Sequence, residues 1–187
     1  MIIGITGRGG SGKSTVAKLI KKHNPEFYYI DVDLLVENSV LNSDLLINKV
    51  NMLFEDKKYT IDDIVMSYFK KDEQNREIHR LFIDEVERVL YDKISSLNSK
   101  NIIIDWFLLH KMTLFKDIDI KILTVLDKSE RIKRVSNREK TKDIDTFIAV
   151  DNCYDENYCC KFDYIIDTMN DICMDGIYSH LSKGKRE

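Results

Sequence analysis

A glycine-rich segment near the start of the chain matches the phosphate-binding loop G-x-x-x-x-G-K-[ST] at every required position. Glycines let the backbone turn tightly and point its N–H groups at phosphate oxygens, where side chains would block the approach. The lysine of such a loop reaches the β- and γ-phosphates, and the hydroxyl after it ligates magnesium. The motif therefore predicts ATP and Mg2+ as ligands. The predicted nucleotide-binding residues are Gly7, Arg8, Gly9, Gly10, Ser11, Gly12, Lys13, Ser14 and Thr15.

Within this loop we assign three individual roles. Lys13 is predicted to be catalytic as well as nucleotide-binding, and Ser14 is predicted to be a metal ligand. Arg8 adds a second cation, which either contacts phosphate or is solvated.

Three aspartates follow apolar runs of the sequence and are candidates for the remaining chemistry. Phosphoryl transfer needs a carboxylate that orients the metal and a group that deprotonates the acceptor. Asp105 comes directly after an apolar run, where a Walker-B aspartate lies, and we predict that it acts at Mg2+ through water. Asp31 and Asp33 alternate along an extended segment and would point to opposite sides. We expect one of them to face the phosphates and choose Asp33 as the general base.

Three arginines, Arg131, Arg134 and Arg138, are spaced by three and four residues, which puts them near one face of a helix. Such a run is usually a solvated, charged face. Because this one follows an apolar run in a chain with a phosphate-binding loop, we favour a lid over about residues 128–142 that supplies arginines to the phosphates. In this interpretation Arg134 is catalytic, and Arg131 and Arg138 bind the nucleotide.

Five short apolar runs would position these groups. Continuous apolar runs separated by helical patterns indicate a parallel sheet that is covered on both faces. Aspartates follow four of the runs, and open α/β sheets bind their ligands at the carboxyl ends of their strands. The predicted fold class is therefore α/β, with three α/β/α layers and a five-stranded parallel sheet. The runs are Ile2–Thr6, Phe27–Ile30, Ile102–Ile104, Ile120–Leu126 and Tyr164–Ile166.

Helical periodicity fills the intervals between these runs. One predicted helix covers Ser14–Lys22, and the long segment of about residues 34–100 contains three more, at Asp44–Phe54, Ile61–Phe69 and Arg76–Leu97. Thr60 and Asp63 form a predicted capping box before the middle helix of the three. This segment is longer than a crossover needs, so it either holds the acceptor or is structural packing. We predict one domain over residues 1–187, with its core at 1–33 and 101–182.

Composition and charge narrow the function class. The net charge of −3 and the pI near 5.9 argue against a general nucleic-acid binder. No apolar run approaches the roughly 18 to 20 residues that span a bilayer, and the first residues do not have the pattern of a signal peptide. We expect no membrane partner and a cytoplasmic location. The four cysteines, whose spacing does not match a zinc site, are expected to be buried or half-buried thiols: Cys153, Cys159, Cys160 and Cys173.

The order of these features resembles the dephospho-coenzyme A kinase family, from Met1 to about Asn170. The opening GITGRGGSGKSTVAKLI is similar to the start of that family, YIDVD to its D-A-D motif, and IDWFLL to its D-x-P-L-L motif. The segment Arg131–Arg138 matches the arginine lid, and FDYIIDT is similar to A-D-Y-V-I-D-N beside the adenine site. The resemblance implies a P-loop kinase fold and transfer of phosphate from ATP to the ribose 3′-hydroxyl of dephospho-CoA, in coenzyme A biosynthesis. It also implies that Asp33 is the base and that Asp105 matches the aspartate of D-x-P-L-L.

The sequence departs from the family pattern at six positions, although His79 matches the family histidine. Most of the departures fall on the acceptor side, and a basic residue that meets an acceptor phosphate loses that contact when Glu37 or Ile61 replaces it. Three functions therefore stay open: a kinase of dephospho-CoA, a kinase of another nucleoside, nucleotide or small metabolite, and an inactive ATP-binding regulatory protein. The oligomeric state also stays open. The departures are Glu37, Ile61, Arg80, Phe107, Lys111 and Asp151.

Overall fold

The chain forms two compact units, which are described separately below. The structure is a computed structural model, and it describes residues 1–41, 44–54, 57–67, 70, 72–138, 144–154, 158, 161–170 and 172–183. One unit, the sheet unit, contains Met1–Asp31, Ser99–His110 and Phe115–Glu187. The other, the helical unit, contains Val32–Asn98 and Lys111–Leu114.

The sheet unit is built on a parallel sheet with the strand order β2-β3-β1-β4-β5. The five predicted strands are confirmed, with ends that differ from the predicted runs by at most one residue. Since all strands are parallel, their carboxyl ends lie along one edge, where Ile5 and Asp31 are both register partners of Asp105. The strands are β1 Ile2–Thr6, β2 Tyr28–Asp31, β3 Ile102–Asp105, β4 Ile120–Val125 and β5 Tyr164–Asp167.

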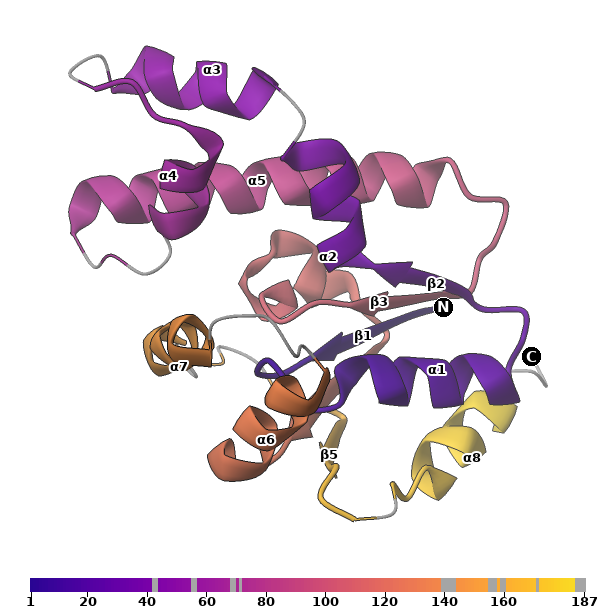
Figure 1. Cartoon of the computed structure of the whole chain (residues 1–187). Helices are drawn as coiled ribbons and strands as arrows, with labels where there is room; N and C mark the ends of the chain where they lie inside the picture. The colour runs from indigo at the N-terminus through magenta and orange to yellow at the C-terminus, as the bar shows by residue number, and fades with distance from the viewer. Residues whose placement is uncertain are drawn as a thin grey trace. The chain divides into compact units, whose positions relative to one another are not determined.

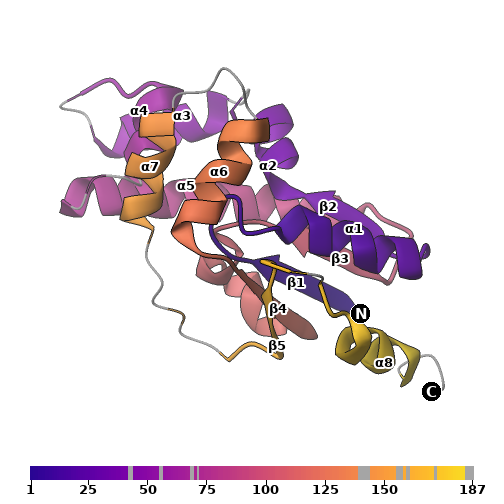
Figure 2. The same cartoon turned by 60° about the horizontal axis from the view of Figure 1, so that its bottom comes forward.

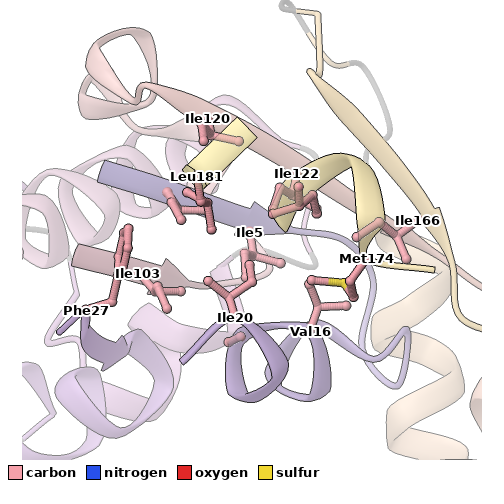
Figure 3. Packing of buried hydrophobic residues seen from close by; sticks show 13 residues of the cluster. Ile5, Val16, Ile20, Phe27, Ile103, Ile120, Ile122, Ile166, Met174 and Leu181 are labelled. Carbon is pink, nitrogen blue, oxygen red and sulfur yellow. The ribbon is translucent and has the colours of Figure 1, made fainter. Parts of the chain in front are cut away.

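Helices α1 (Lys13–His23) and α8 (Asp175–Lys183) cover one face of this sheet (Figures 1 and 2). Their apolar side chains interlock with those of the strands in a buried cluster that is shown in Figure 3. On the opposite face, Leu109 and Ile118 lie so close to the backbone of β1 that a Cβ on Gly4 would be 2.5 Å from Ile118 Cδ1. The chain thus has the three-layer α/β/α arrangement that the sequence predicts. Two more helices, α6 (Lys128–Arg138) and α7 (Ile144–Cys153), follow β4.

The helical unit begins where β2 ends. Its first helix, α2 (Val32–Leu35), continues into a single π-helical turn, η1 (Val36–Val40), and is followed by α3 (Asp44–Leu53), α4 (Ile61–Met66) and α5 (Glu73–Ser95). The capping box is confirmed, because Thr60 Oγ1 accepts a hydrogen bond from the Asp63 N–H and Asp63 Oδ2 accepts one from the Thr60 N–H. Helix α5 starts three residues earlier than predicted, since Asp72 caps it by accepting from the Asn75 N–H.

Buried acidic groups of α5 hold the helical unit together. Glu85 accepts hydrogen bonds from Lys49 of α3, 3.1 Å away, and from Arg88 of its own helix. The buried Glu87 carboxylate accepts from the backbone N–H groups of Thr113 and Leu114 and thereby satisfies the start of a short 3-10 helix, η4 (Thr113–Asp117). These contacts position α3 and the Lys111–Leu114 segment on the long helix.

Cys173 is exposed in the segment before α8, 3.8 Å from Asp175 Oδ2, so the expectation of a buried or half-buried thiol is wrong for this residue. Cys159 and Cys160 lie outside the described residues, as does the side chain of Cys153. In the parts of the chain that the structure describes, every helix is too short or too polar to cross a bilayer.

His79 of α5 makes the stability of the helical unit sensitive to pH. Burial lowers the pKa of His79 to about 4, and the positive charge of Lys111 acts in the same direction. Between the ordinary value of 6.5 and about 4, the unfolded chain therefore binds more protons than the folded protein, and stability falls as the pH falls. We expect His79 to lower the unfolding free energy by roughly 2 kcal/mol between neutral pH and about pH 5, as measured by urea unfolding.

The control for this prediction is His79→Gln, which removes the titrating group. The variant should lose less stability than the wild type over the same pH interval, by about the same 2 kcal/mol. If the two proteins had parallel stability profiles between these pH values, His79 would not be the group responsible.

Candidate nucleotide-binding site

The phosphate-binding loop joins β1 to α1 and has the backbone conformation that its glycines permit. Gly10 has φ +76° and Gly12 has φ +92°, values in the left-handed region that side chains disfavour. A Cβ on Gly10 would lie 3.0 Å from the Arg131 carbonyl oxygen, and one on Gly12 would lie 3.0 Å from the Thr168 side chain. Glycine is therefore required at both positions, because a side chain would be strained at this φ and would also crowd its neighbours.

Residues at the ends of β4 and β5 hold the loop in place. The Ser11 hydroxyl is 2.6 Å from the Thr124 hydroxyl in a buried pair, and Thr168 Oγ1 donates a hydrogen bond of 2.8 Å to the Ser11 carbonyl. The side chain of Ser11, which the sequence predicts to bind nucleotide, thus contacts Thr124 of β4, and the Ser11 N–H donates to the Arg8 carbonyl at 3.2 Å. Thr15 is exposed in the first turn of α1.

Lys13 and Ser14 are the first two residues of α1, which places them at the amino end of a helix directly after the loop. Lys13 Nζ donates to the Arg8 carbonyl at 3.2 Å, so the ammonium group folds back over the loop. Ser14 Oγ donates to Asp105 Oδ2 at 2.7 Å. The loop cation, the serine hydroxyl and the aspartate at the end of β3 are thereby brought together, as the motif requires.

The Ser14–Asp105 pair has the chemistry of a partial magnesium site. A hydroxyl and a carboxylate are hard oxygen ligands, which Mg2+ prefers, and Mg2+ usually takes one or two protein groups together with phosphate and water. Among the described residues, no group of three or more His, Cys, Asp and Glu side chains converges on a metal position. The pair therefore fits a metal that shares its ligands with a bound nucleotide.

The Asp105 side chain is almost fully buried, at 3% exposure, and several neighbouring groups influence its pKa in opposite directions. Burial raises the pKa of Asp105, while the charge of Lys13 and the hydrogen bonds from Ser14 and Tyr29 lower it, and the net pKa is above its usual value of 3.8. Tyr29 Oη donates to the same oxygen as Ser14, at 3.0 Å. Sequence analysis did not identify Tyr29, since a tyrosine in an apolar strand has no local signal beyond its β propensity.

Arg131, which the sequence predicts to bind nucleotide, contacts a protein carboxylate in this structure. It is 3% exposed and forms a two-pronged ion pair with Asp151 of α7, with Nη2 3.0 Å from Oδ2. Arg8 of the loop joins the same carboxylate, with Nη1 3.3 Å from Oδ1 and 2.6 Å from the Asp151 carbonyl. Arg8 of the loop and Arg131 of α6 therefore converge on one protein carboxylate in this structure.

Asp151 is a residue that the sequence analysis treated only as a departure from a family pattern. The signal that could have found it is a single carboxylate among apolar residues, in the stretch that reads FIAVD. Burial raises the pKa of Asp151, but the hydrogen bonds of Arg131 and the charges of Arg131 and Arg8 outweigh it, so the pKa lies below its usual value. A pocket of about 300 Å³ adjoins the network and is lined by Arg8, Lys128, Arg131, Asp151 and Asn152.

We expect Asp151→Asn to lower the unfolding free energy by on the order of 3 kcal/mol, measured by urea unfolding at neutral pH. The amide keeps the volume of the carboxylate but leaves the buried Arg131 guanidinium without its counter-charge. Asp145→Asn is the matched control, because Asp145 is exposed in the first turn of the same helix and should cost no more than about 1 kcal/mol. Equal losses in the two variants would contradict the assigned ion pair.

The other two arginines of α6 differ in their surroundings. Arg134 Nη1 donates to Thr168 Oγ1 at 3.0 Å, and its second amino group donates to the Thr168 carbonyl, so Arg134 is bonded to the residue that holds the loop at Ser11. Arg138 is exposed in the last turn of α6. Helix α6 accounts for residues 128–138 of the predicted lid, and residues 139–142 lie outside the described residues.

The predicted base, Asp33, belongs to the helical unit. It lies in the first turn of α2, two residues after the end of β2, and its side chain is exposed. Asp31 is the last residue of β2 and the register partner of Asp105. The assignment of Asp33 as base stays a prediction.

Several known proteins resemble the chain in sequence or in fold. A family model described as "AAA domain" matches residues 3–158. The chain is 24% identical to a dephospho-CoA kinase of Clostridium perfringens over 147 residues. This alignment covers 74% of this chain and 73% of that protein. It is 30% identical over 164 residues to a cytidylate kinase of Fusobacterium nucleatum, covering 78% of this chain and 73% of the relative.

Among solved structures, TT1252 from Thermus thermophilus superposes with a TM-score of 0.69 at 21% identity, covering 98% of this chain and 97% of the other. At this identity the likeness concerns the fold. The two sequence relatives are both kinases by name, but they are named for different acceptors.

Proposed function

The chain belongs to the AAA domain family within the P-loop kinases, and from this premise we propose that it transfers the γ-phosphoryl group of Mg-ATP to a hydroxyl group of a small, nucleotide-like acceptor. The observation that carries the proposal is the arrangement at the carboxyl ends of β1 and β3. There the Lys13 ammonium lies over the loop and the Ser14 hydroxyl is bonded to Asp105. This arrangement supports the proposal, because a cation, a hydroxyl and a carboxylate that lie close together could bind phosphate and orient a metal.

In this mechanism the loop N–H groups and Lys13 hold the β- and γ-phosphates and stabilise the charge that develops on them. Ser14 would hold Mg2+ directly and Asp105 would hold it through water. When bound, the metal would neutralise part of the negative charge of the phosphates. Burial of Asp105 supports its role, because a carboxylate away from bulk solvent interacts more strongly with a cation.

The acceptor hydroxyl would be oriented and deprotonated by Asp33, and its exposure in the first turn of α2 leaves it accessible to a small molecule. Arg134 would stabilise the transferring group, with Arg131, Arg138 and Arg8 as further cations of the site. The exclusion of water by α6 would limit hydrolysis of ATP. We assign acceptor binding to the helical segment of about residues 34–100.

Dephospho-CoA is the favoured acceptor, because the Asp31–Asp33 motif and the arginine helix both match that family. A second candidate, a nucleotide or nucleoside, is favoured by the 30% identity to a cytidylate kinase and by the acidic Glu37 at a position where the family carries arginine. A regulatory ATP-binding protein without activity is the third reading. The retention of Lys13, Ser14, Asp33, Asp105 and the lid arginines argues against it.

The test is ADP release from Mg-ATP, with mass spectrometry of the acceptor, in the presence of dephospho-CoA, CMP, dCMP or a set of nucleosides. A gain of one phosphate by dephospho-CoA, with at least a tenfold stimulation of ADP release, would establish the favoured acceptor. Phosphorylation of CMP or a nucleoside alone would establish the second candidate. Tight, Lys13-dependent ATP binding without phosphate transfer to any acceptor would contradict the proposed kinase activity.

A further inference from the structure

We propose that Tyr29 is a positioning residue of the metal site, which holds the Asp105 carboxylate so that Ser14 presents its lone pairs to Mg2+. This inference rests on the proposed function, because it concerns the same magnesium nucleotide. It starts from the observation that two hydroxyl groups, Ser14 Oγ and Tyr29 Oη, donate to the one oxygen Asp105 Oδ2, at 2.7 and 3.0 Å.

The sheet register explains how a tyrosine on β2 reaches an aspartate on β3. Tyr29 is the partner of Ile103 and Asp31 is the partner of Asp105, so Tyr29 lies diagonally across from Asp105. Residues two apart on a strand share a face, and a diagonal neighbour is within reach of a long aromatic side chain. The Tyr29 ring packs against the buried cluster under α1, which fixes the direction of its hydroxyl.

The direction of these hydrogen bonds matters for the metal. A serine hydroxyl has one proton and two lone pairs, and a proton committed to Asp105 leaves the lone pairs for a cation. This works only while the accepting carboxylate oxygen stays in position. Asp105 is 3% exposed, and both hydroxyl groups that donate to this oxygen belong to the protein: Ser14 at the start of α1 and Tyr29 on β2, outside the loop segment.

Outer-shell partners of metal ligands are known to orient the ligands and to tune metal affinity, and their removal typically costs roughly tenfold or more. The Tyr29 hydroxyl has this relation to Asp105 and Ser14. Its loss should therefore weaken the contribution of the metal to nucleotide binding, while the loop itself, anchored by Thr124 and Thr168, still binds phosphate.

The experiment is calorimetric titration of the whole chain with ADP, with excess Mg2+ and separately with EDTA, for the wild type and Tyr29→Phe. In the wild type, we expect ADP to bind more tightly with Mg2+ than with EDTA. In Tyr29→Phe this increase in ADP affinity should be about tenfold smaller, while the ADP affinity measured with EDTA stays within about twofold of the wild type. Tyr28→Phe is the matched control on the same strand, because Tyr28 is 38% exposed and points to the other face. It should behave as the wild type.

Each outcome decides between the two ideas. Equal losses with Mg2+ and with EDTA would mean that Tyr29 only supports the fold, and unchanged affinities would mean that its hydroxyl is dispensable; either result overturns the inference and leaves the proposed function intact. A wild-type protein whose ADP affinity does not respond to Mg2+ would overturn the proposed function as well. Melting temperatures of both variants within a few degrees of the wild type exclude unfolding as the cause.

Discussion

Lys13→Met is expected to lower phosphoryl transfer from ATP by about a thousandfold, the larger of the two main effects on activity that follow from the site. The Lys13 ammonium is the cation at the start of α1 that folds over the phosphate-binding loop, with Nζ 3.2 Å from the Arg8 carbonyl. Methionine keeps a similar unbranched stem but has no charge, so the charge that builds on the β- and γ-phosphates loses its partner. The measurement is ADP release at saturating ATP and acceptor, together with ATP affinity by calorimetry.

The matched control is Lys18→Met in the same helix, because Lys18 is exposed one turn further along. It should keep turnover within about twofold of the wild type, since exposed substitutions away from a site have small effects. If Lys13→Met retained a tenth or more of the wild-type rate while staying folded, the loop would not be the phosphate-binding element of the reaction.

Asp33→Asn is expected to lower turnover by about a hundredfold or more, which is the usual contribution of a general base. The amide has the size and hydrogen-bonding reach of the carboxylate but cannot take a proton from the acceptor hydroxyl. ATP affinity should change little, because Asp33 acts on the acceptor and lies in the helical unit, outside the loop. Single-turnover phosphorylation of the acceptor identified above measures this step directly.

Asp62→Asn provides the control for loss of an exposed carboxylate in the same unit, since Asp62 lies in the first turn of α4. Its turnover should match the wild type. Near-normal turnover of Asp33→Asn would remove Asp33 from the mechanism, and the same substitution at Asp31, the register partner of Asp105, would then be the next to test.

Features that depend on the local sequence pattern could be predicted, and features that depend on contacts between distant residues could not. The strands were predictable because each is a short apolar run that ends at an aspartate or a glycine, and the Thr60–Asp63 cap was predictable because both partners lie within one helical turn. The start of α5 was missed by three residues because the cap at Asp72 has a weaker sequence pattern.

The surroundings of the three arginines of α6 could be predicted only in part from their spacing. Their spacing predicted a common helix face, and Arg131, Arg134 and Arg138 do lie on α6. Which of them is buried depends on α7, whose Asp151 lies 20 residues beyond Arg131 and 143 residues beyond Arg8. Helical periodicity contains no information about such a partner, so the buried ion pair of Arg131 could not be predicted from its spacing.

By itself, the sequence determined the α/β class, the five strands and the loop with Lys13 and Ser14, because apolar periodicity and glycine conformation act over a few neighbouring residues. Only the tertiary structure decided that Tyr29 and Ser14 donate to one oxygen of Asp105, that Thr168 holds both Ser11 and Arg134, and that Asp151 pairs with Arg8 and Arg131. The physical reason is that these groups come from strands and helices far apart in the chain. Strand order and register determine which buried polar groups are close enough to pair, and both are set only when the sheet assembles.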